Sequence, residues 1–126
     1  MIDPTKAFSG FAVNNVEAAA TFYRDTLGVE VTEEEGMLFL RLGPDRQVLA
    51  YPKPGHVPAT FTILNFPVDD IEQAVDDLTG RGVRFERYDA FEHDERGIAR
   101  SQGGPPIAWF TDPSGNILSV LQAPGV

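Results

Sequence analysis

The chain has 126 residues, a net charge of −9 and a pI near 4.5. That length, with 42% hydrophobic and 23% charged residues, is typical of a single globular domain with its own core. The negative charge argues against nucleic-acid or anionic-membrane partners, which need a basic face, and the absence of cysteine excludes disulfides, thiolate metal sites and cysteine nucleophiles.

A strand and a helix open the predicted first half. Residues 7–13 are predicted as a strand, and the apolar residues after it recur at the spacing of one helix face. These residues are Val16, Ala19, Ala20, Tyr23 and Leu27. Asn14 or Asn15 can cap the helix, and Glu17 stands three residues after Asn14, as a capping box requires. Gly28 ends the helix, because glycine tolerates the left-handed turn needed there.

Three strands follow this helix, at 29–34, 37–42 and 47–52, and the sequence GPDR predicts the turn between the last two. Two rows of side chains alternate along the middle strand: Leu38, Leu40 and Leu42 on one side, and Met37, Phe39 and Arg41 on the other. We expect the leucine row to face the core and the mixed row to face a cleft. Arg41 is then a candidate partner for an anion, or else an exposed residue at the sheet edge.

The second half repeats the first, since FPVDDIEQAV from residue 66 echoes FAVNNVEAAA from residue 11. It predicts a strand at 61–68 and a helix that Asp69 caps, with Glu72 three residues on and Gly80 or Gly82 at its end. The apolar face of that helix consists of Ile71, Ala74, Val75 and Leu78. Strands are predicted next at 83–88, 106–111 and 116–122, the last two joined by DPSGN.

Each half is therefore predicted as β-α-β-β-β, which makes the chain an α+β protein. One helix covers only one face of a four-stranded sheet, so two such modules must pack or pair to complete a core. We expect the modules to span about 6–53 and 59–123 within a single domain of residues 1–126.

With these elements the chain resembles the vicinal oxygen chelate superfamily, which includes glyoxalases, bleomycin-resistance proteins and extradiol dioxygenases. The similarity covers nearly the whole chain and is most specific at FYRDTLG, which ends the first helix, and at the DPSGN turn. It implies paired βαβββ modules, curved mixed sheets around a cleft with helices on the outside, and often a homodimer.

The resemblance also implies catalysis by a divalent metal, with His and Glu ligands on the first and last strands of each module. The corresponding positions in this chain are Phe8, Leu49 or Tyr51, Ile63 and Ser119. None is a competent ligand, because a catalytic zinc takes about three His, Cys, Asp or Glu side chains and an iron facial triad takes two His and a carboxylate. The two histidines, His56 and His93, lie in predicted loops. We therefore expect no metal and no other cofactor.

The same register makes the cleft apolar and aromatic, with few polar points. The residues expected to bind a ligand there are Phe8, Gly10, Phe39, Arg41, Tyr51, Ile63, Asn65, Trp109, Ser119 and Leu121. Pairing through the DPSGN hairpin places Trp109 beside Ser119, so both share this face. Such a lining is typical of a small-molecule pocket. The alternative is that the cleft is closed and forms a second hydrophobic core, in which the Trp109 side chain only fills space.

The segment 88–106 has no sustained period, and a loop of this length is typical of a functional lid or of disorder. We expect a lid at 89–106, in which Arg96 and Arg100 meet an anionic ligand and His93 carries a proton. Gly103 and Gly104 are candidates for its hinge. A solvated connection or a dimer-contact arm is the alternative.

Three functions stay open from the sequence. The first is a metal-independent protein that binds an apolar or aromatic small molecule, as drug-resistance members do. The second is a lyase, isomerase or dioxygenase-type enzyme of the same superfamily, with Tyr51 or His93 as acid–base groups or with metal ligands at other positions. The third is an interaction module with a vestigial cleft.

Location and partners follow from the same features. No apolar run approaches the ~18 residues of a membrane span, and the N-terminus lacks the layout of a signal peptide. We expect a cytoplasmic homodimer with a small-molecule ligand and no nucleic-acid or membrane partner.

Overall fold

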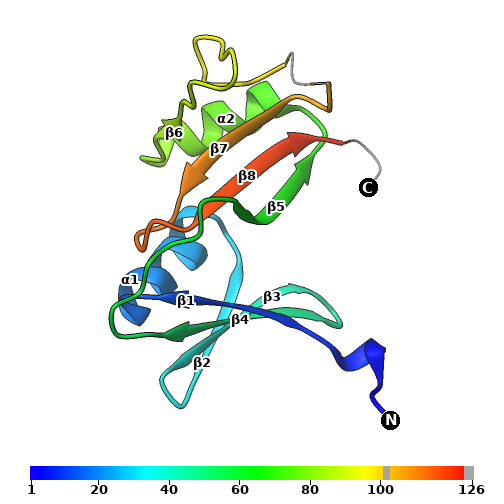
Figure 1. The fold of residues 1–126 in the computed structure, drawn as a ribbon, viewed down its shortest axis with the longest axis vertical. Coiled ribbons are helices and arrows are strands. Elements are labelled where there is room, and N and C mark those ends of the chain that lie inside the picture. Colours follow the sequence, from blue (N-terminus) through cyan, green and yellow to red (C-terminus); the bar gives the residue numbers. More distant parts are fainter. Residues whose placement is uncertain (101–102, 124–126) are drawn as a thin grey trace. The chain divides into compact units, whose positions relative to one another are not determined.

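The computed structural model describes residues 1–100 and 103–123, and the chain forms two compact units, Met1–Val57 and Pro58–Val126. Each unit holds one β-α-β-β-β module with a four-stranded mixed sheet (Figure 1). The predicted α+β fold with two βαβββ modules is confirmed. Within the described residues, no helix has the length and apolar character needed to cross a membrane.

The elements of unit 1 are η1 (Pro4–Lys6), β1 (Ser9–Val13), α1 (Val16–Thr21), η2 (Phe22–Thr26), β2 (Glu30–Glu34), β3 (Met37–Gly43) and β4 (Arg46–Pro52). The sheet order is β1-β4-β3-β2, in which β1 and β4 are parallel and the other pairs antiparallel. The predicted first helix is therefore α1 continued by η2, whose π-helical turn widens the helix around the FYRDT residues.

The core of unit 1 lies between its helix and its sheet. Its fully or almost fully buried apolar residues are Val13, Ala19, Ala20, Tyr23, Leu38, Leu40 and Ala50. The leucine row of β3 faces this core as predicted, although Leu42 at the end of the strand is 37% exposed. On the other face of β3, Phe39 is half-buried, and Met37 and Arg41 are exposed.

The structure selects one of the two predicted caps of the first helix and corrects the predicted cap of the second. The Asn15 side chain, not that of Asn14, accepts a hydrogen bond from the Ala18 N–H at 3.0 Å. In the second helix the Asp70 carboxylate accepts from the Gln73 N–H at 3.2 Å, so the prediction of Asp69 was wrong. A cap must be the last residue with extended backbone, and repeated Asn-Asn and Asp-Asp pairs hide which residue that is.

The elements of unit 2 are β5 (Thr62–Val68), α2 (Ile71–Gly80), β6 (Phe85–Glu86), β7 (Ile107–Thr111) and β8 (Ile117–Gln122). The sheet order β5-β8-β7-β6 repeats that of unit 1, with β5 and β8 parallel. Helix α2 covers one face of this sheet and packs mainly on β8 (Figure 1). Among the described residues of unit 2, no helix covers the opposite face.

Helix α2 ends in a Schellman motif. Gly82 has a φ of 94°, the Gly82 N–H donates to the Thr79 carbonyl, and the Val83 N–H donates to the Leu78 carbonyl, both at 3.0 Å. Of the two glycines predicted to end the helix, Gly82 makes the left-handed turn. The chain then pairs with β7 only at Phe85–Glu86, so the predicted strand at 83–88 is much shorter than expected.

The DPSGN turn between β7 and β8 is a buried polar unit. Asp112 is 4% exposed, and its Oδ1 accepts from the backbone N–H groups of Ser114 at 2.9 Å and Asn116 at 3.0 Å. Its Oδ2 accepts from the Asn116 side-chain amide at 3.0 Å. These bonds fix the hairpin that sets β7 and β8 in register, so the motif has a structural role.

Candidate functional site: an aromatic hollow on unit 2

An aromatic cluster lies around Trp109 on the side of the unit 2 sheet away from α2. The Phe91 ring stacks on the indole with a centroid separation of 5.1 Å and an interplanar angle of 29°. Tyr88 and His93 meet the indole edge-on, with centroids 5.4 and 6.1 Å from it. Because Trp109 is only 9% exposed, its ring is a fixed surface and not a mobile side chain.

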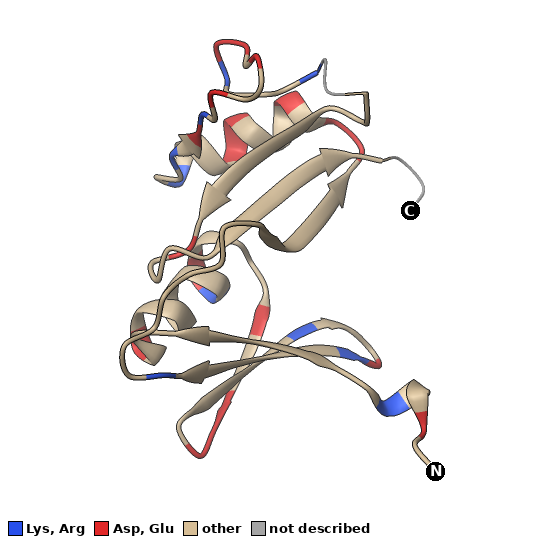
Figure 2. Cartoon of the chain, viewed as in Figure 1, with Lys and Arg blue, Asp and Glu red and all other residues tan. Residues whose placement is uncertain are grey.

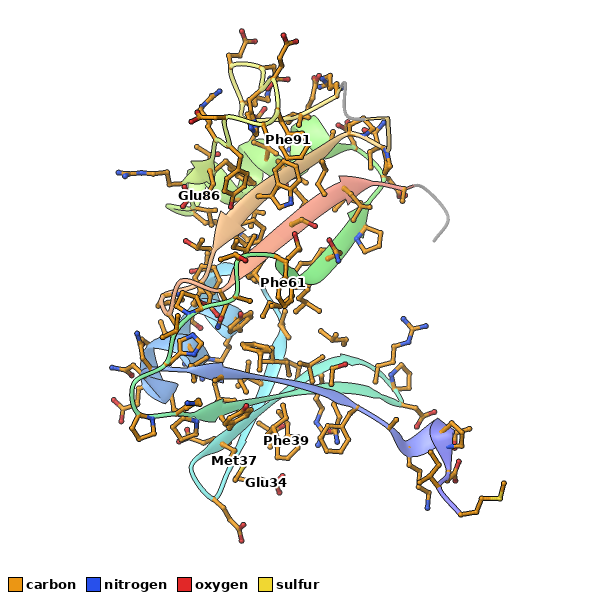
Figure 3. The ribbon with its side chains drawn as sticks, viewed as in Figure 1. Glu34, Met37, Phe39, Phe61, Glu86 and Phe91 are labelled. Carbon is orange, nitrogen blue, oxygen red and sulfur yellow. The ribbon has the colours of Figure 1, made fainter. Side chains whose placement is uncertain are left out.

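This cluster borders a hollow of about 270 Å³. The residues lining it are Thr60, Phe61, Thr62, Tyr88, Phe91, Trp109 and Ile117. Phe61 and Phe91, labelled in Figure 3, are 67% and 38% exposed, so two large aromatic side chains remain open to solvent here. The size and lining suit a small aromatic molecule.

A β-bulge gives this hollow one of its polar groups. The register of β5 against β8 shifts between Thr62 and Leu64, so Thr62 stands opposite Ile117 and Ile63 has no ladder partner. The Trp109 Nε1–H donates to the Thr62 hydroxyl at 3.1 Å, which orients the indole. The sequence analysis predicted that Ile63, and not Thr62, lies on this face of the strand, because it assumed a regular alternation of side chains without a bulge.

Tyr88 brings the other polar group. Burial, together with the nearby Glu86 carboxylate, raises the pKa of the Tyr88 phenol above its ordinary value. The phenol is therefore protonated at neutral pH and can both donate and accept a hydrogen bond. No described residue forms a hydrogen bond with the Tyr88 hydroxyl, so this hydroxyl is available to a ligand.

His93 anchors the loop that holds these aromatic rings. Its Nε2 accepts from the Tyr88 backbone N–H at 3.0 Å, and its Nδ1 lies 2.9 Å from the Gly97 carbonyl. The first contact needs an unprotonated Nε2 and the second a proton on Nδ1, which assigns the neutral tautomer. Both ring nitrogens are thus engaged, and the geometry favours an anchoring role over the predicted proton carrier.

Several hydrogen bonds hold the loop around His93 in place. The Asp94 carboxylate accepts from the Arg96 and Ile98 N–H groups, both at 2.9 Å. Arg87 donates to the backbone carbonyls of Asp94 at 2.9 Å and Glu95 at 3.0 Å. Ile98 is buried, and one bridge, between Ala99 and Ile107, joins this segment to β7. These contacts hold the described part of the predicted lid against the rest of unit 2, and positions 101–102 of that prediction lie outside the described residues.

The two arginines of the predicted lid pair with acidic residues. Arg96 contacts the Asp76 carboxylate at 2.9 Å, and Arg100 contacts the Glu72 carboxylate at 2.8 Å. Both acids belong to α2, on the other side of the sheet from the hollow. The structure therefore gives these guanidinium groups a role in holding the loop to α2, and does not bring them to the aromatic cluster.

The loop should show a pH-dependent stability through Asp94. Burial acts to raise the pKa of Asp94, but hydrogen bonds from Ile98, Arg96 and Arg100 outweigh it and hold the pKa below its ordinary 3.8. A carboxylate with a lowered pKa stabilises the fold above its unfolded pKa and loses that contribution as the pH falls through the folded pKa. We expect Asp94→Asn to lower the stability of unit 2 by about 1 kcal/mol near neutral pH, and this difference to vanish in acid.

Urea unfolding followed by Trp109 fluorescence, repeated from about pH 7 to about pH 3, measures this effect. Asp89→Asn is the matched control, because Asp89 is exposed in the same loop and makes no hydrogen bond that the structure describes. A difference between Asp94→Asn and the parent that stays constant down to about pH 3 would contradict the assignment.

The predicted site residues of unit 2 share the uncovered face of its sheet. Trp109 pairs with Ser119 as expected, and Asn65 pairs with Ser119 from the other side. The Ser119 hydroxyl donates to the Asn65 carbonyl oxygen at 2.6 Å, and Leu121 is half-buried further along β8. Only Trp109 of these lines the hollow.

The sequence analysis did not identify Thr62, Tyr88 and Phe91 as lining residues. Tyr88 and Phe91 are aromatic residues at the end of a predicted strand and in a polar loop, and this placement was the available signal. Their convergence depends on the loop that returns the chain over Trp109, which no local pattern encodes.

The other predicted ligand contacts belong to unit 1. Gly10, Leu49 and Phe39 are aligned across β1, β4 and β3 on the face away from the leucine row. Phe8 and Tyr51 are 53% and 37% exposed. Arg41 donates from Nε to the Thr32 hydroxyl at 3.3 Å, and its Nε lies 3.9 Å from the Glu30 carboxylate. Arg41 and Phe8 also border a wide hollow of about 870 Å³ at the end of this sheet.

The donor set does not fit a divalent metal. The positions where the resemblance places ligands hold Phe8, Leu49, Tyr51, Ile63 and Ser119, which offer no imidazole or carboxylate. Across residues 1–100 and 103–123, no three His, Cys, Asp or Glu side chains are grouped to hold an ion. His56, whose Nε2 is buried without a described hydrogen-bond partner, has no such group around it.

Solved structures of the same fold come from several bacteria. A glyoxalase family protein from Enterococcus faecalis is 22% identical, with 91% of this chain and 94% of that chain covered at a TM-score of 0.68. TnmS3, an antibiotic binding protein from Streptomyces sp. CB03234, is 22% identical with 92% and 94% covered and a TM-score of 0.65. The fosfomycin resistance protein FosX from Listeria monocytogenes is 12% identical with 93% and 91% covered and a TM-score of 0.69.

A search of curated proteins finds no match to this chain. The family model described as Glyoxalase/Bleomycin resistance protein/Dioxygenase superfamily matches residues 5–120, which is nearly the whole chain. With two βαβββ modules in the order that the superfamily implies, the chain belongs to the glyoxalase/bleomycin resistance protein/dioxygenase superfamily.

Proposed function

We propose that this protein binds a small aromatic or apolar molecule in the Trp109 hollow, without a divalent metal. The observation that carries the proposal is the stacked Phe91–Trp109 pair at the edge of a hollow with exposed aromatic walls. Large apolar side chains held open to water lower stability unless they serve a contact, so their concentration here favours a ligand surface.

The relatives support the class of function and not the ligand. TnmS3 is described as an antibiotic binding protein, and FosX as a fosfomycin resistance protein. At their low identity to this chain they share its fold, and function must be argued from the site. In this chain, the aromatic hollow is the feature that supports a binding role.

The enzyme and interaction alternatives have less support. The sequence analysis named Tyr51 and His93 as acid–base groups for an enzyme without metal, and His93 gives both ring nitrogens to the backbone. Tyr51 is exposed on unit 1, where it remains a proposed ligand contact together with Phe8, Gly10, Phe39 and Arg41. The homodimer that the resemblance implies and the cytoplasmic location expected from the sequence belong to the same proposal.

Two measurements test the proposed function. Elemental analysis by plasma mass spectrometry, after incubation with zinc, manganese, iron(II) and nickel and gel filtration, should find no stoichiometric metal. Titration calorimetry with 2-naphthylmethanol, a neutral aromatic probe, should show one saturable site per chain. Stoichiometric metal, or no binding of any aromatic probe up to millimolar concentration, would contradict the proposal.

A further inference from the structure

The sheet of unit 2 carries a single charged residue. Strands β5, β7 and β8 contain no Asp, Glu, Lys or Arg, and in Figure 2 these three strands are uniformly tan. Glu86 in β6 is the exception. The other charges of this unit lie on α2, in the turns and along the 84–100 segment.

Glu86 lies on the same face as the aromatic cluster. In the antiparallel pair of β6 and β7 it stands directly opposite Trp109, and directly opposed residues point to the same side of a sheet. Tyr88, two residues further on, contacts the indole edge. Glu86, labelled in Figure 3, is half-buried and stands next to Trp109 of the cluster without lining the hollow itself.

No cation neutralises Glu86 in the described part of the chain. It makes no ion pair or hydrogen bond there. Arg84 is exposed and forms no described ion pair with Glu86, and three further arginines have other partners. Arg87 donates to two backbone carbonyls, while Arg96 and Arg100 pair with carboxylates of α2. The charge of Glu86 nevertheless reaches the aromatic cluster, since it helps to raise the pKa of Tyr88. A half-buried carboxylate that has no described partner and lies beside an aromatic cluster can attract the cationic group of a ligand.

We propose that the hollow selects ligands in which an aromatic ring is joined to a protonated amine, with Glu86 as the counter-ion. This inference rests on the proposed binding function and makes it specific. The ring would stack against Phe91 and Trp109, and the ammonium group would lie between the carboxylate and the faces of the aromatic rings, which attract cations. The Tyr88 hydroxyl offers it a further acceptor. An anionic ligand meets repulsion at the same place.

Three probes with one ring system separate charge from shape. These are 2-naphthylmethylamine, which is protonated near pH 7, the neutral 2-naphthylmethanol and the anionic 2-naphthoate. Titration calorimetry gives each Kd. The chain has one tryptophan, so its indole N–H gives a single NMR cross peak that reports whether each probe reaches Trp109.

We expect the amine to bind at least about tenfold more tightly than the alcohol, and the naphthoate to bind most weakly. Glu86→Gln should weaken the amine about tenfold and change the alcohol less than about twofold. Raising the salt concentration should weaken only the amine, because ions screen the carboxylate. The control Asp69→Asn removes the same charge from an exposed position before α2, and should leave all three Kd values unchanged.

The outcomes distinguish this inference from the proposed function. If the alcohol binds and shifts the indole peak but the amine binds no better, the charge preference is wrong and the binding function stands. If no probe shifts the peak, the proposed function itself fails. An equal loss in Asp69→Asn would assign the preference to net charge and overturn the role of Glu86. The probe ranking and its salt dependence in the parent protein decide the question even if Glu86→Gln folds poorly.

Discussion

Replacing Trp109 with alanine should weaken the binding of 2-naphthylmethanol by about 30-fold or more, because the indole is the central buried wall of the hollow. The same change should lower the free energy of unfolding of unit 2 by about 3–5 kcal/mol, since a nearly buried tryptophan leaves a large cavity. Titration calorimetry measures the first effect, and urea unfolding followed by far-ultraviolet circular dichroism measures the second.

Two companion variants separate binding from stability. Phe91→Ala removes an exposed ring that stacks on Trp109, so it should weaken the probe about tenfold with less than about 1 kcal/mol of stability lost. Trp109→Phe keeps an aromatic wall but loses the hydrogen bond to Thr62, and should bind between the parent and Trp109→Ala. A folded Trp109→Ala or Phe91→Ala protein that binds the probe as the parent does would show that the ligand lies elsewhere.

Replacing Asp112 with alanine should lower the free energy of unfolding of unit 2 by about 3–5 kcal/mol. The substitution leaves the buried N–H groups of Ser114 and Asn116 without their acceptor and removes the partner of the Asn116 amide. Unpaired buried donors cost more than the hydrogen bonds themselves contribute. Urea unfolding followed by Trp109 fluorescence measures the change.

Asp112→Asn is the matched comparison for this turn. It keeps the Oδ1 acceptor for the two N–H groups and loses only the acceptor for the Asn116 amide, so we expect a loss of about 1–2 kcal/mol. Asp89→Asn at an exposed position should change nothing. Equal stability of Asp112→Ala and the parent would show that the turn is not the rigid element described here.

The fold was largely predictable because its signals are local and repeated. The helix stripe around Ala19, Ala20 and Tyr23 is buried as expected, and the DPSGN turn places Trp109 opposite Ser119. The predictions that differ from the structure concern details that depend on several neighbouring residues at once. Paired Asn and Asp residues left each cap ambiguous, and the bulge at Ile63 interrupts an alternation that the sequence presents as regular.

The site was predictable only in part for a related reason. A strand pattern assigns residues to a face and placed Trp109 opposite Ser119, but two walls of the hollow, Tyr88 and Phe91, come from the 88–100 segment. That segment is ordered by side-chain contacts with the backbone, such as those of His93 and Asp94, and these have no periodic signature. Charged residues in a loop look like ligand contacts from sequence, although Arg96 and Arg100 instead pair with α2.

The position of the last strand in each sheet has a consequence for the order of folding during synthesis. In both sheets the final strand is internal, since β4 lies between β1 and β3, and β8 lies between β5 and β7. The first strand therefore has no neighbour until the last has been made. The sheet of unit 1 can close once Pro52 has left the ribosome, whereas that of unit 2 must wait for Gln122. Until then the edges of β5 and β7 that β8 later covers are unpaired, and unpaired strand edges are open to chaperones and to aggregation.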